Sequence, residues 1–446
     1  MLKSSPILDI AVIGSGIAGM SAAWLLSQKH KVTVYEREYR LGGHSNTVEA
    51  PVNDGAVPVD TGFIIFNERN YPNLTALFKH LDVPTKDSEM SFAASLDDGR
   101  MEYSGTDINS MLGQRRNIIR PRFWSMLKDV RRFYRDAPKF LSNKNSADWS
   151  LGHFLQVHHY SKPFIDDHLL PMGAAIWSAS ATEILNFPAV AFIRFFESHG
   201  LLEVVNRPTW RTVDGGSQEY VRRLTQGYRD CILLGLPAKS VHRNDGAVFV
   251  ESDGGGRRRF DHVVVATHAD QALGLLADAD TQESRLLGAI RYSQNLAVLH
   301  NDIRLMPKRK RVWSSWNYLQ SQKIGEETSL CVTYWMNRLQ GIDPAYPLFV
   351  TLNPYIEPNS KSVIGEYSYD HPLFDRAALN AQQHLWSLQG RRNTWFCGSY
   401  FGYGFHEDAL QSGLAVAEAV GGVRRPWTVP EESGRIALPQ SIHAAA

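Results

Sequence analysis

Three glycines and one acid near the start of the chain have the spacing of a nucleotide-binding turn. Gly14, Gly16 and Gly19 follow an apolar run over residues 10–13, and Glu36 ends a second apolar run 20 residues after Gly16. The first glycine permits a sharp turn, the second lets a pyrophosphate approach the backbone, and the third lets a helix pack closely on the strand. Glu36 lies where an acid can accept hydrogen bonds from ribose hydroxyls. The pattern predicts a dinucleotide-binding βαβ unit.

The helix expected after this turn favours a bound phosphate. Ile17 and Ala18 follow Gly16, and residues 20–28 are a helix-forming segment. The first N–H groups of a helix have no partners inside it and carry a partial positive charge, so they can bind a pyrophosphate. An acid at Glu36 would repel the 2′-phosphate of NADP. We therefore expect Ile17 and Ala18 to contact a dinucleotide other than NADP.

A second glycine turn comes directly after the acid. Arg37 follows Glu36, and Gly42 and Gly43 precede His44. Here the chain resembles the flavin amine oxidase and carotenoid desaturase superfamily, in which an acid–Arg pair and a Gly-Gly-[Arg/His] turn line an extended FAD. The resemblance implies that FAD is the cofactor and that Arg37, Gly42, Gly43 and His44 contact it. A nicotinamide dehydrogenase is the alternative, although such enzymes rarely need the second turn.

The resemblance extends to further places along the chain. The additional residues that it predicts to contact FAD are Thr61, Gly62, Val241, Gly398, Asp408 and Ala409. In the superfamily, the last helix aims its N-terminus at the pyrimidine edge of the flavin, where it stabilises the negative charge of the reduced form. Asp408 stands where the superfamily has glycine, and its side chain could cap that helix. The alternatives are an ordinary strand turn at Gly62 and an edge strand unrelated to adenine at Val241.

His406 and Glu407 are the ionisable residues predicted to lie nearest the flavin, and we name them as catalytic candidates. A structural role at a helix start is the alternative for each. The sequence contains no second Gly-x-Gly-x-x-Gly unit, which favours a substrate that itself reduces FAD by hydride transfer. It shows no catalytic triad, paired acids or metal-ligand cluster, as expected where a cofactor carries the chemistry.

The predicted fold is α/β, with a Rossmann-like FAD-binding domain and a discontinuous mixed α+β substrate domain, as in amine oxidases. Apolar strands at residues 262–267 and 393–398 are expected to return to the nucleotide-binding sheet, and periodic segments at 71–81, 124–134 and 190–198 predict helices. The expected boundaries are 1–90, 208–285 and 386–425 for the FAD-binding domain, 91–207 and 286–385 for the substrate domain, and 426–446 for a C-terminal tail. Residues 421–446 are expected to be mobile.

Composition narrows the classes of function. A chain of 446 residues favours two domains, and a formal net charge of +1 gives no sign of a nucleic-acid partner. Three separated cysteines indicate neither disulfides nor a metal site. The start of the chain does not resemble a signal peptide, and no apolar run is long enough to span a membrane. We therefore expect a cytoplasmic protein, on the inner face of the membrane if it binds one.

Two basic and aromatic stretches suggest contact with an anionic membrane surface. Between residues 110 and 140 there are nine basic residues against two acids, and Pro121 could start an amphipathic helix. The expected apolar face of that helix comprises Phe123, Leu127, Val130, Tyr134 and Ala137. A second stretch, residues 308–311, precedes Trp313 and Trp316. The alternative is that the apolar face simply joins the protein core.

The residue patterns at 171–178 and 62–67 resemble those of a bacterial branch of the superfamily. That branch is associated with modified membrane fatty acids, including desaturation of methylated acyl chains on the way to furan fatty acids. The resemblance implies an FAD-dependent desaturase or oxidase of a lipid or other hydrophobic substrate, with dioxygen or another acceptor reoxidising FAD. A soluble flavin amine oxidase is the first alternative, and a non-catalytic membrane-associated flavoprotein is the second.

Overall fold

A parallel sheet of five strands carries the glycine motif. The computed structural model describes residues 6–53, 55–142, 149–203, 207–244, 246–254, 256–321, 331–421 and 423–439. The strands, in sheet order, are β10 (Ile232–Leu234), β2 (Lys31–Glu36), β1 (Asp9–Ile13), β14 (His262–Val265) and β20 (Thr394–Phe396). All four neighbouring pairs are parallel. The apolar runs expected to return to this sheet do so, because strands covered on both faces need apolar residues throughout.

Helix α1 (Ile17–Ser27) packs on this sheet, and α15 (His406–Gly421) packs along α1. A Cβ on Gly413 would lie only 2.3 Å from the carbonyl oxygen of Ala18, so glycine is what lets the two helices approach this closely. The remaining helices of this half are α2 (Pro72–His80), α10 (Gln218–Thr225), α11 (Ala269–Leu275), α12 (Thr281–Leu287) and α14 (Arg376–Leu385). Helix α2 confirms the helix predicted at residues 71–81.

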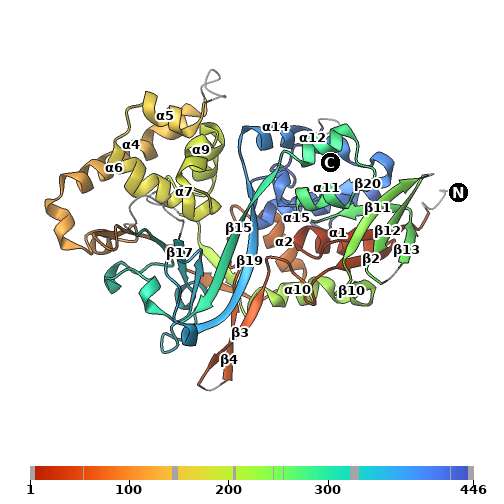
Figure 1. Cartoon of the computed structure of the whole chain (residues 1–446), viewed down its shortest axis with the longest axis horizontal. Coiled ribbons are helices and arrows are strands. Elements are labelled where there is room, and N and C mark those ends of the chain that lie inside the picture. Colours follow the sequence, from red (N-terminus) through yellow and green to blue (C-terminus); the bar gives the residue numbers. More distant parts are fainter. Residues whose placement is uncertain are drawn as a thin grey trace.

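A mixed seven-stranded sheet forms much of the other half. Its order is β19 (Val363–Leu373), β15 (Arg291–His300), β18 (Phe349–Leu352), β17 (Cys331–Trp335), β16 (Trp316–Leu319), β7 (Phe92–Leu96) and β8 (Met101–Ser104). The long antiparallel pair β15 and β19 runs down the middle of the molecule, between the parallel sheet and the helical lobe (Figure 1). The fold is therefore the predicted α/β arrangement with a mixed second part.

Three smaller sheets complete the strands. An antiparallel sheet contains β11 (Ala238–Asn244), β12 (Ala247–Ser252) and β13 (Gly256–Phe260). A hairpin joins β3 (Thr47–Val52) to β4 (Gly55–Asp60), and a third sheet has the order β5 (Ile65–Asn67), β9 (Trp210–Val213) and β6 (Thr85–Ser88). The hairpin and β5 place residues 60–67 beside the glycine turns.

The helical lobe lies beyond the mixed sheet (Figure 1). Its helices are α3 (Ile108–Met111), α4 (Pro121–Phe140), α5 (Leu151–Val157), α6 (Lys162–Phe164), α7 (Leu170–Trp177), α8 (Ala181–Asn186) and α9 (Ala189–Ser198), and α13 (Met336–Gln340) follows β17. Aromatic contacts fill this lobe, such as the stack of Phe192 on Phe196 with ring centroids 4.3 Å apart.

Helix α4 begins at Pro121, as predicted, but its apolar face lies inside the protein. Of the expected face, Phe123 and Ala137 are fully buried, and Leu127, Val130 and Tyr134 are partly buried and pack against the core. The interpretation of this face as a lipid-contacting surface is therefore wrong, and the alternative, that it joins the core, holds. Within the described ranges, none of the helices has the length and apolar character needed to cross a bilayer.

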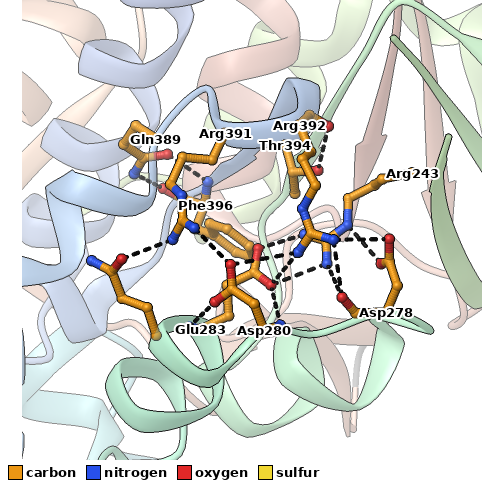
Figure 2. A network of polar contacts seen from close by, with 10 residues as sticks. Arg243, Asp278, Asp280, Glu283, Gln389, Arg391, Arg392, Thr394 and Phe396 are labelled. Carbon is orange, nitrogen blue, oxygen red and sulfur yellow. Dashed lines mark hydrogen bonds and ion pairs between the residues drawn. The ribbon is translucent and has the colours of Figure 1, made fainter. Parts of the chain in front are cut away.

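A buried ion-pair network ties three separate elements together at the end of the parallel sheet (Figure 2). Arg243 in β11 donates two hydrogen bonds to Glu283 in α12, at 2.5 and 3.0 Å. Arg392, in the turn before β20, donates a third to Glu283 at 2.9 Å. The side chains of Arg243 and Glu283 are each 1% exposed. These contacts fix β11 and α12 against the strand that precedes the last helix.

The C-terminal segment is packed through its described residues, which run to 439. Trp427 stacks on Trp24 of α1 with ring centroids 5.8 Å apart. Arg435 makes an ion pair with Asp408 of α15 at 3.3 Å. The expectation of a mobile tail is wrong for residues 426–439, because aromatic and ionic contacts hold them on the nucleotide-binding half. Residues 440–446 of the predicted tail lie outside the described residues.

Candidate active site

One large cavity joins the glycine turns to the mixed sheet. Its volume is about 1140 Å³, above the range of about 300–1,000 Å³ usual for a small-molecule pocket. One end is lined by the β1–α1 turn and the end of β2, and the other by α7 and the strands β16, β17 and β18. The cavity thus has room for an extended dinucleotide and for a second molecule beside it.

Fourteen of the eighteen residues predicted from the sequence line this cavity. They are Gly14, Gly16, Ile17, Ala18, Glu36, Arg37, Gly42, Gly43, His44, Thr61, Gly62, Gly398, His406 and Ala409. They come from segments far apart in the chain, which the parallel sheet and α15 bring together. Which of them touch a cofactor remains a prediction.

The first glycine turn is shaped to leave a space in front of Gly16. A Cβ on Gly19 would lie 2.0 Å from the carbonyl oxygen of Gly14, so the absence of a side chain there is needed for the helix to pack. A Cβ on Gly16, by contrast, would meet no described atom within 4 Å. No described side chain caps helix α1 at this residue. The backbone is thus open to a ligand where a pyrophosphate was predicted.

The second glycine turn lies directly against the first. The Gly42 N–H donates to the Ser15 carbonyl at 3.0 Å. Gly43 has φ +57°, and a Cβ there would lie 3.2 Å from the Gly16 Cα. The two turns form one continuous backbone surface at the cavity wall. This contact explains why the sequence carries both turns.

Glu36 holds the first turn in place as well as facing the cavity. Its carboxylate accepts hydrogen bonds from the Ser15 N–H at 2.8 Å, the Ser15 hydroxyl at 2.6 Å and the Glu38 N–H at 2.8 Å. Glu36 is only 8% exposed. Arg37 is largely exposed at the rim and pairs with Glu38. An acid at position 36 is therefore needed both by the loop and by the predicted ribose.

We expect Glu36→Ala to weaken FAD binding by about 30-fold. The substitution removes charge-assisted hydrogen bonds that contribute about 2 kcal/mol. The measurement is the FAD dissociation constant of the apoprotein by fluorescence titration. The matched control is Glu68→Ala, which removes an exposed acid that does not line the cavity and should change the constant by less than about twofold. Equal affinities for Glu36→Ala and the parent protein would contradict the role.

His406 lies at the cavity wall as the first residue of α15. Its ring stacks on Phe63 with centroids 3.9 Å apart and planes within 8°. Its Nε2 is hydrogen-bonded to the Tyr220 hydroxyl at 2.7 Å and lies 3.2 Å from the Ser45 Oγ. Burial lowers the pKa of His406 to about 3. The imidazole is therefore neutral and rigidly oriented at neutral pH.

Glu407 does not face the cavity, contrary to its prediction as a catalytic candidate. Its carboxylate accepts hydrogen bonds from the Asn73 and Leu74 N–H groups, each at 3.0 Å, and from the Gln411 side chain. Asn73 and Leu74 lie in the first turn of α2, where N–H groups lack helical partners. Glu407 thus caps α2 and joins it to α15, which is the structural alternative.

Asp408 is also turned away from the cavity. Its carboxylate accepts the Phe405 N–H at 2.7 Å and pairs with Arg435. Because α15 begins at His406, this contact caps the helix from its third residue. The predicted cap is confirmed, whereas the direct contact with FAD has no support from the side chain's position. Ala409, the next residue, does line the cavity.

Val241 does not line the cavity. The other three predicted residues that do not line it are Gly19, Glu407 and Asp408. Val241 is fully buried, and its carbonyl accepts the Ala277 N–H at 3.1 Å. The cavity wall in this region is formed instead by Pro237 and Ala238, at the start of β11. Val241 lies on the strand that begins at this wall, three positions after Ala238, and its contact with the cofactor stays a prediction. The sequence feature that could have identified this part of the wall is the pair Pro237 and Ala238, which follows β10.

The sequence interpretation predicted His44 but missed three cavity residues beside it, His268, Tyr369 and His371. His44 lies with its ring 5.6 Å from that of His371, 6.2 Å from that of His268 and 5.0 Å from that of Tyr369. Burial lowers the pKa of His371 to about 4. Burial, followed by His371 and His268, holds the pKa of His44 well below its usual range. Among the described residues, this cluster does not have the geometry of a metal site.

The fold and the cavity define a class of protein: an oxidoreductase that binds an extended dinucleotide between a parallel sheet and a substrate-binding part. A family model described as flavin containing amine oxidoreductase matches residues 17–300. The chain belongs to this family and is an FAD-dependent enzyme. The open space at Gly16 fits the pyrophosphate of that cofactor.

Solved structures show the same fold over nearly the whole chain. The fatty acid isomerase of P. acnes that produces CLA is 16% identical, with a TM-score of 0.65, and covers 94% of this chain and 99% of that one. Cyclohexylamine oxidase from Brevibacterium oxydans IH-35A has the same identity and coverage, with a TM-score of 0.66. Carotenoid phi-ring synthase of Streptomyces griseus is 43% identical over 75 residues, which span 16% of this chain and 14% of that protein.

Proposed function

We propose that the protein desaturates a hydrophobic chain, specifically an acyl chain of a phospholipid. A hydride leaves one carbon and a proton leaves its neighbour, so a C=C double bond forms between them. Bound FAD supplies the hydride acceptor, and dioxygen or another oxidant takes the electrons afterwards. Methylated acyl chains, on the way to furan fatty acids, are the substrates that the sequence resemblance favours.

The observation that carries this proposal is the apolar end of the cavity. The described lining residues from α7, β16, β17 and β18 are all apolar or aromatic: Ile176, Trp177, Trp316, Tyr334 and Leu352. Such walls bind a hydrocarbon chain through burial of apolar surface, at about 25 cal/mol per Å². Two similar proteins are named for substrates of this kind, a fatty acid and a carotenoid.

Three imidazoles of the cavity are neutral. His44, His371 and His406 all line it. Because burial holds their pKa values below the usual range, each is uncharged at neutral pH. An uncharged ring does not repel an apolar chain, and its lone pair can pass a released proton on to water, because a ring with a lowered pKa does not hold the proton at neutral pH. Phe63 and Tyr220 keep the His406 ring in one orientation.

Anaerobic reduction of bound FAD tests the substrate class directly. The protein is mixed without oxygen with methyl-branched phospholipids, with unbranched phospholipids or with polyamines, and bleaching of the visible flavin band is followed. We expect bleaching by the branched phospholipids, with a new double bond found by mass spectrometry. Bleaching by polyamines alone would establish an amine oxidase, and bleaching by none of them would establish a non-catalytic flavoprotein. Either result would overturn the proposal.

A cavity-filling variant tests where the chain binds. Ile176→Trp adds volume at the apolar end, so we expect bleaching by a long acyl chain to slow by about tenfold or more. Reoxidation of chemically reduced flavin by dioxygen should stay unchanged. The matched control is Val157→Trp, because Val157 is 43% exposed and does not line the cavity. An equal rate for Ile176→Trp and the parent would place the substrate elsewhere.

A further inference from the structure

An exposed apolar cluster lies just before helix α4. Four of the eleven exposed large apolar side chains in the described part of the chain fall within residues 108–124. They are Ile108, Ile118, Ile119 and Trp124, with exposed fractions of 77%, 45%, 80% and 51%. The indole N–H of Trp124 donates to the Ile118 carbonyl at 2.8 Å, which fixes the ring beside the isoleucines. In Figure 1 this orange segment lies at the outer left end of the molecule.

Basic residues from two distant stretches surround this cluster. Arg115, Arg116 and Arg120 belong to the short turn before α4. The second stretch, residues 308–311, is held beside them through Glu102 of β8, which accepts the Lys308 N–H and the Arg309 guanidinium, each at 2.7 Å. The sequence had suggested two separate basic clusters. The fold joins them at one edge of the mixed sheet.

The nearby acids are engaged and leave the arginines in excess. Residues 100–124 contain five arginines and two acids, Glu102 and Asp107. Glu102 is fully buried against Arg309, and Asp107 accepts the Ser110 N–H as the cap of α3. Arg115 and Arg120 hydrogen-bond to amide and carbonyl oxygens rather than to carboxylates. Their positive charge therefore remains available to an external anion.

The tryptophans of the second stretch do not belong to this surface. The Trp313 indole donates to the Pro307 carbonyl, and its ring packs on Trp335. Trp316 lines the cavity. The sequence interpretation that placed both at a membrane is wrong. The exposed apolar residues come instead from the turn before α4, which that interpretation did not single out.

We propose that this surface docks the protein on an anionic lipid bilayer. We define the docking surface as Ile108, Ile118, Ile119 and Trp124 with Arg115, Arg116, Arg120, Lys308, Lys310 and Arg311. Protruding apolar side chains enter the boundary between headgroups and acyl chains, tryptophan favours that boundary, and arginines pair with lipid phosphates. A bilayer supplies both the apolar layer and the negative charge that the surface lacks.

The position of the docking surface suits an enzyme that takes a lipid. The surface adjoins β8, the edge strand of the mixed sheet, and β16, whose Trp316 lines the cavity, is two strands away in the same sheet. Neighbouring strands are about 4.8 Å apart, so the cavity wall lies about 10 Å from that edge. This inference rests on the proposed lipid substrate for its purpose, but docking itself requires no turnover.

Vesicle binding of the FAD-loaded protein tests the proposal without any reaction. Flotation is measured with vesicles of unbranched phosphatidylcholine, alone and mixed with phosphatidylglycerol. We expect binding to the mixed vesicles only, and weaker binding as salt rises. Equal binding to both kinds, or to neither, would overturn the proposal. The outcome of this test does not depend on the substrate. Vesicle binding could fail while dispersed lipid still bleaches the flavin, or vesicle binding could succeed while no lipid bleaches it.

Variants locate the contact on the molecule. Ile119→Asp should weaken binding to the mixed vesicles by about tenfold or more, and Arg116→Gln by about fivefold. Matched controls on the nucleotide-binding half are Ile7→Asp, at a residue 68% exposed, and Arg257→Gln in β13, and both should bind like the parent. Losses as large in the controls would overturn the assignment. So would a change of oligomeric state in Ile119→Asp, since a second copy would then cover the surface.

Discussion

A Gly16→Val variant will fold normally and fail to retain FAD. Gly16 has φ −66° and ψ 175°, a conformation open to valine, and a Cβ there meets no described atom within 4 Å. The added methyl groups would instead occupy the space for the pyrophosphate. If the cofactor loses two charge-assisted hydrogen bonds to the helix N-terminus, each about 1.5–3 kcal/mol, its dissociation constant rises by about 150-fold to 25,000-fold. The measurement is the flavin-to-protein ratio after gel filtration, with titration of the apoprotein.

Two comparison variants separate loss of the cofactor from loss of the fold. Gly227→Val adds the same groups at an exposed glycine that also has open space in front of it but lies outside the cavity, and it should bind FAD like the parent. Gly19→Ala places a methyl group against the Gly14 carbonyl and should lower the unfolding temperature of the apoprotein. Full flavin occupancy in Gly16→Val would remove the basis for placing the pyrophosphate at this turn.

Local chemistry explains which site residues could be predicted from the sequence. The two glycine turns depend on steric requirements that only glycine meets, so their spacing is visible without a structure. The contact between Gly43 and Gly16 depends on the fold. Each of the two glycines, however, can be recognised from the sequence pattern alone. Val241 was chosen from a strand in which several positions look alike in sequence, and it does not line the cavity. Only the structure shows that Pro237 and Ala238 reach the cavity.

Residues whose partners are distant in the chain were beyond sequence reasoning. Glu407 looked catalytic beside a flavin, yet its partners Asn73 and Leu74 lie more than 300 positions earlier. Tyr369 and His371 are two positions apart on β19, so their side chains point to the same face of the strand. That spacing could be recognised from the sequence. The meeting of both side chains with His44 depends on how β19 crosses to the parallel sheet. Similarly, an amphipathic pattern alone could not show that α4 turns its apolar face inward.

We expect Glu283→Ala to lower the free energy of unfolding by about 3–5 kcal/mol. Glu283 accepts hydrogen bonds from Arg243 and Arg392, and its removal leaves the fully buried Arg243 guanidinium with Asp278 as its remaining acid (Figure 2). Arg243 keeps its ion pair with Asp278 but loses the buried acid that accepts two of its hydrogen bonds, and removing one partner of a buried ion pair carries a cost of this size. The measurement is denaturant unfolding of the apoprotein. Asp253→Ala is the control, because its ion pair with Lys239 is more than half exposed and should contribute less than about 1 kcal/mol.

A double substitution distinguishes the cost of a stranded charge from the value of the ion pair itself. Arg243→Met combined with Glu283→Leu removes both charges and keeps apolar volume in the buried site, so it should recover at least about half of the stability lost in Glu283→Ala. Arg392 and Asp278 retain their own ion pair at 3.1 Å, so neither is stranded. A double variant as unstable as the single one would mean that the pair is needed for its geometry. In that case, the network would set the position of β11, and with it the Pro237–Ala238 wall of the cavity.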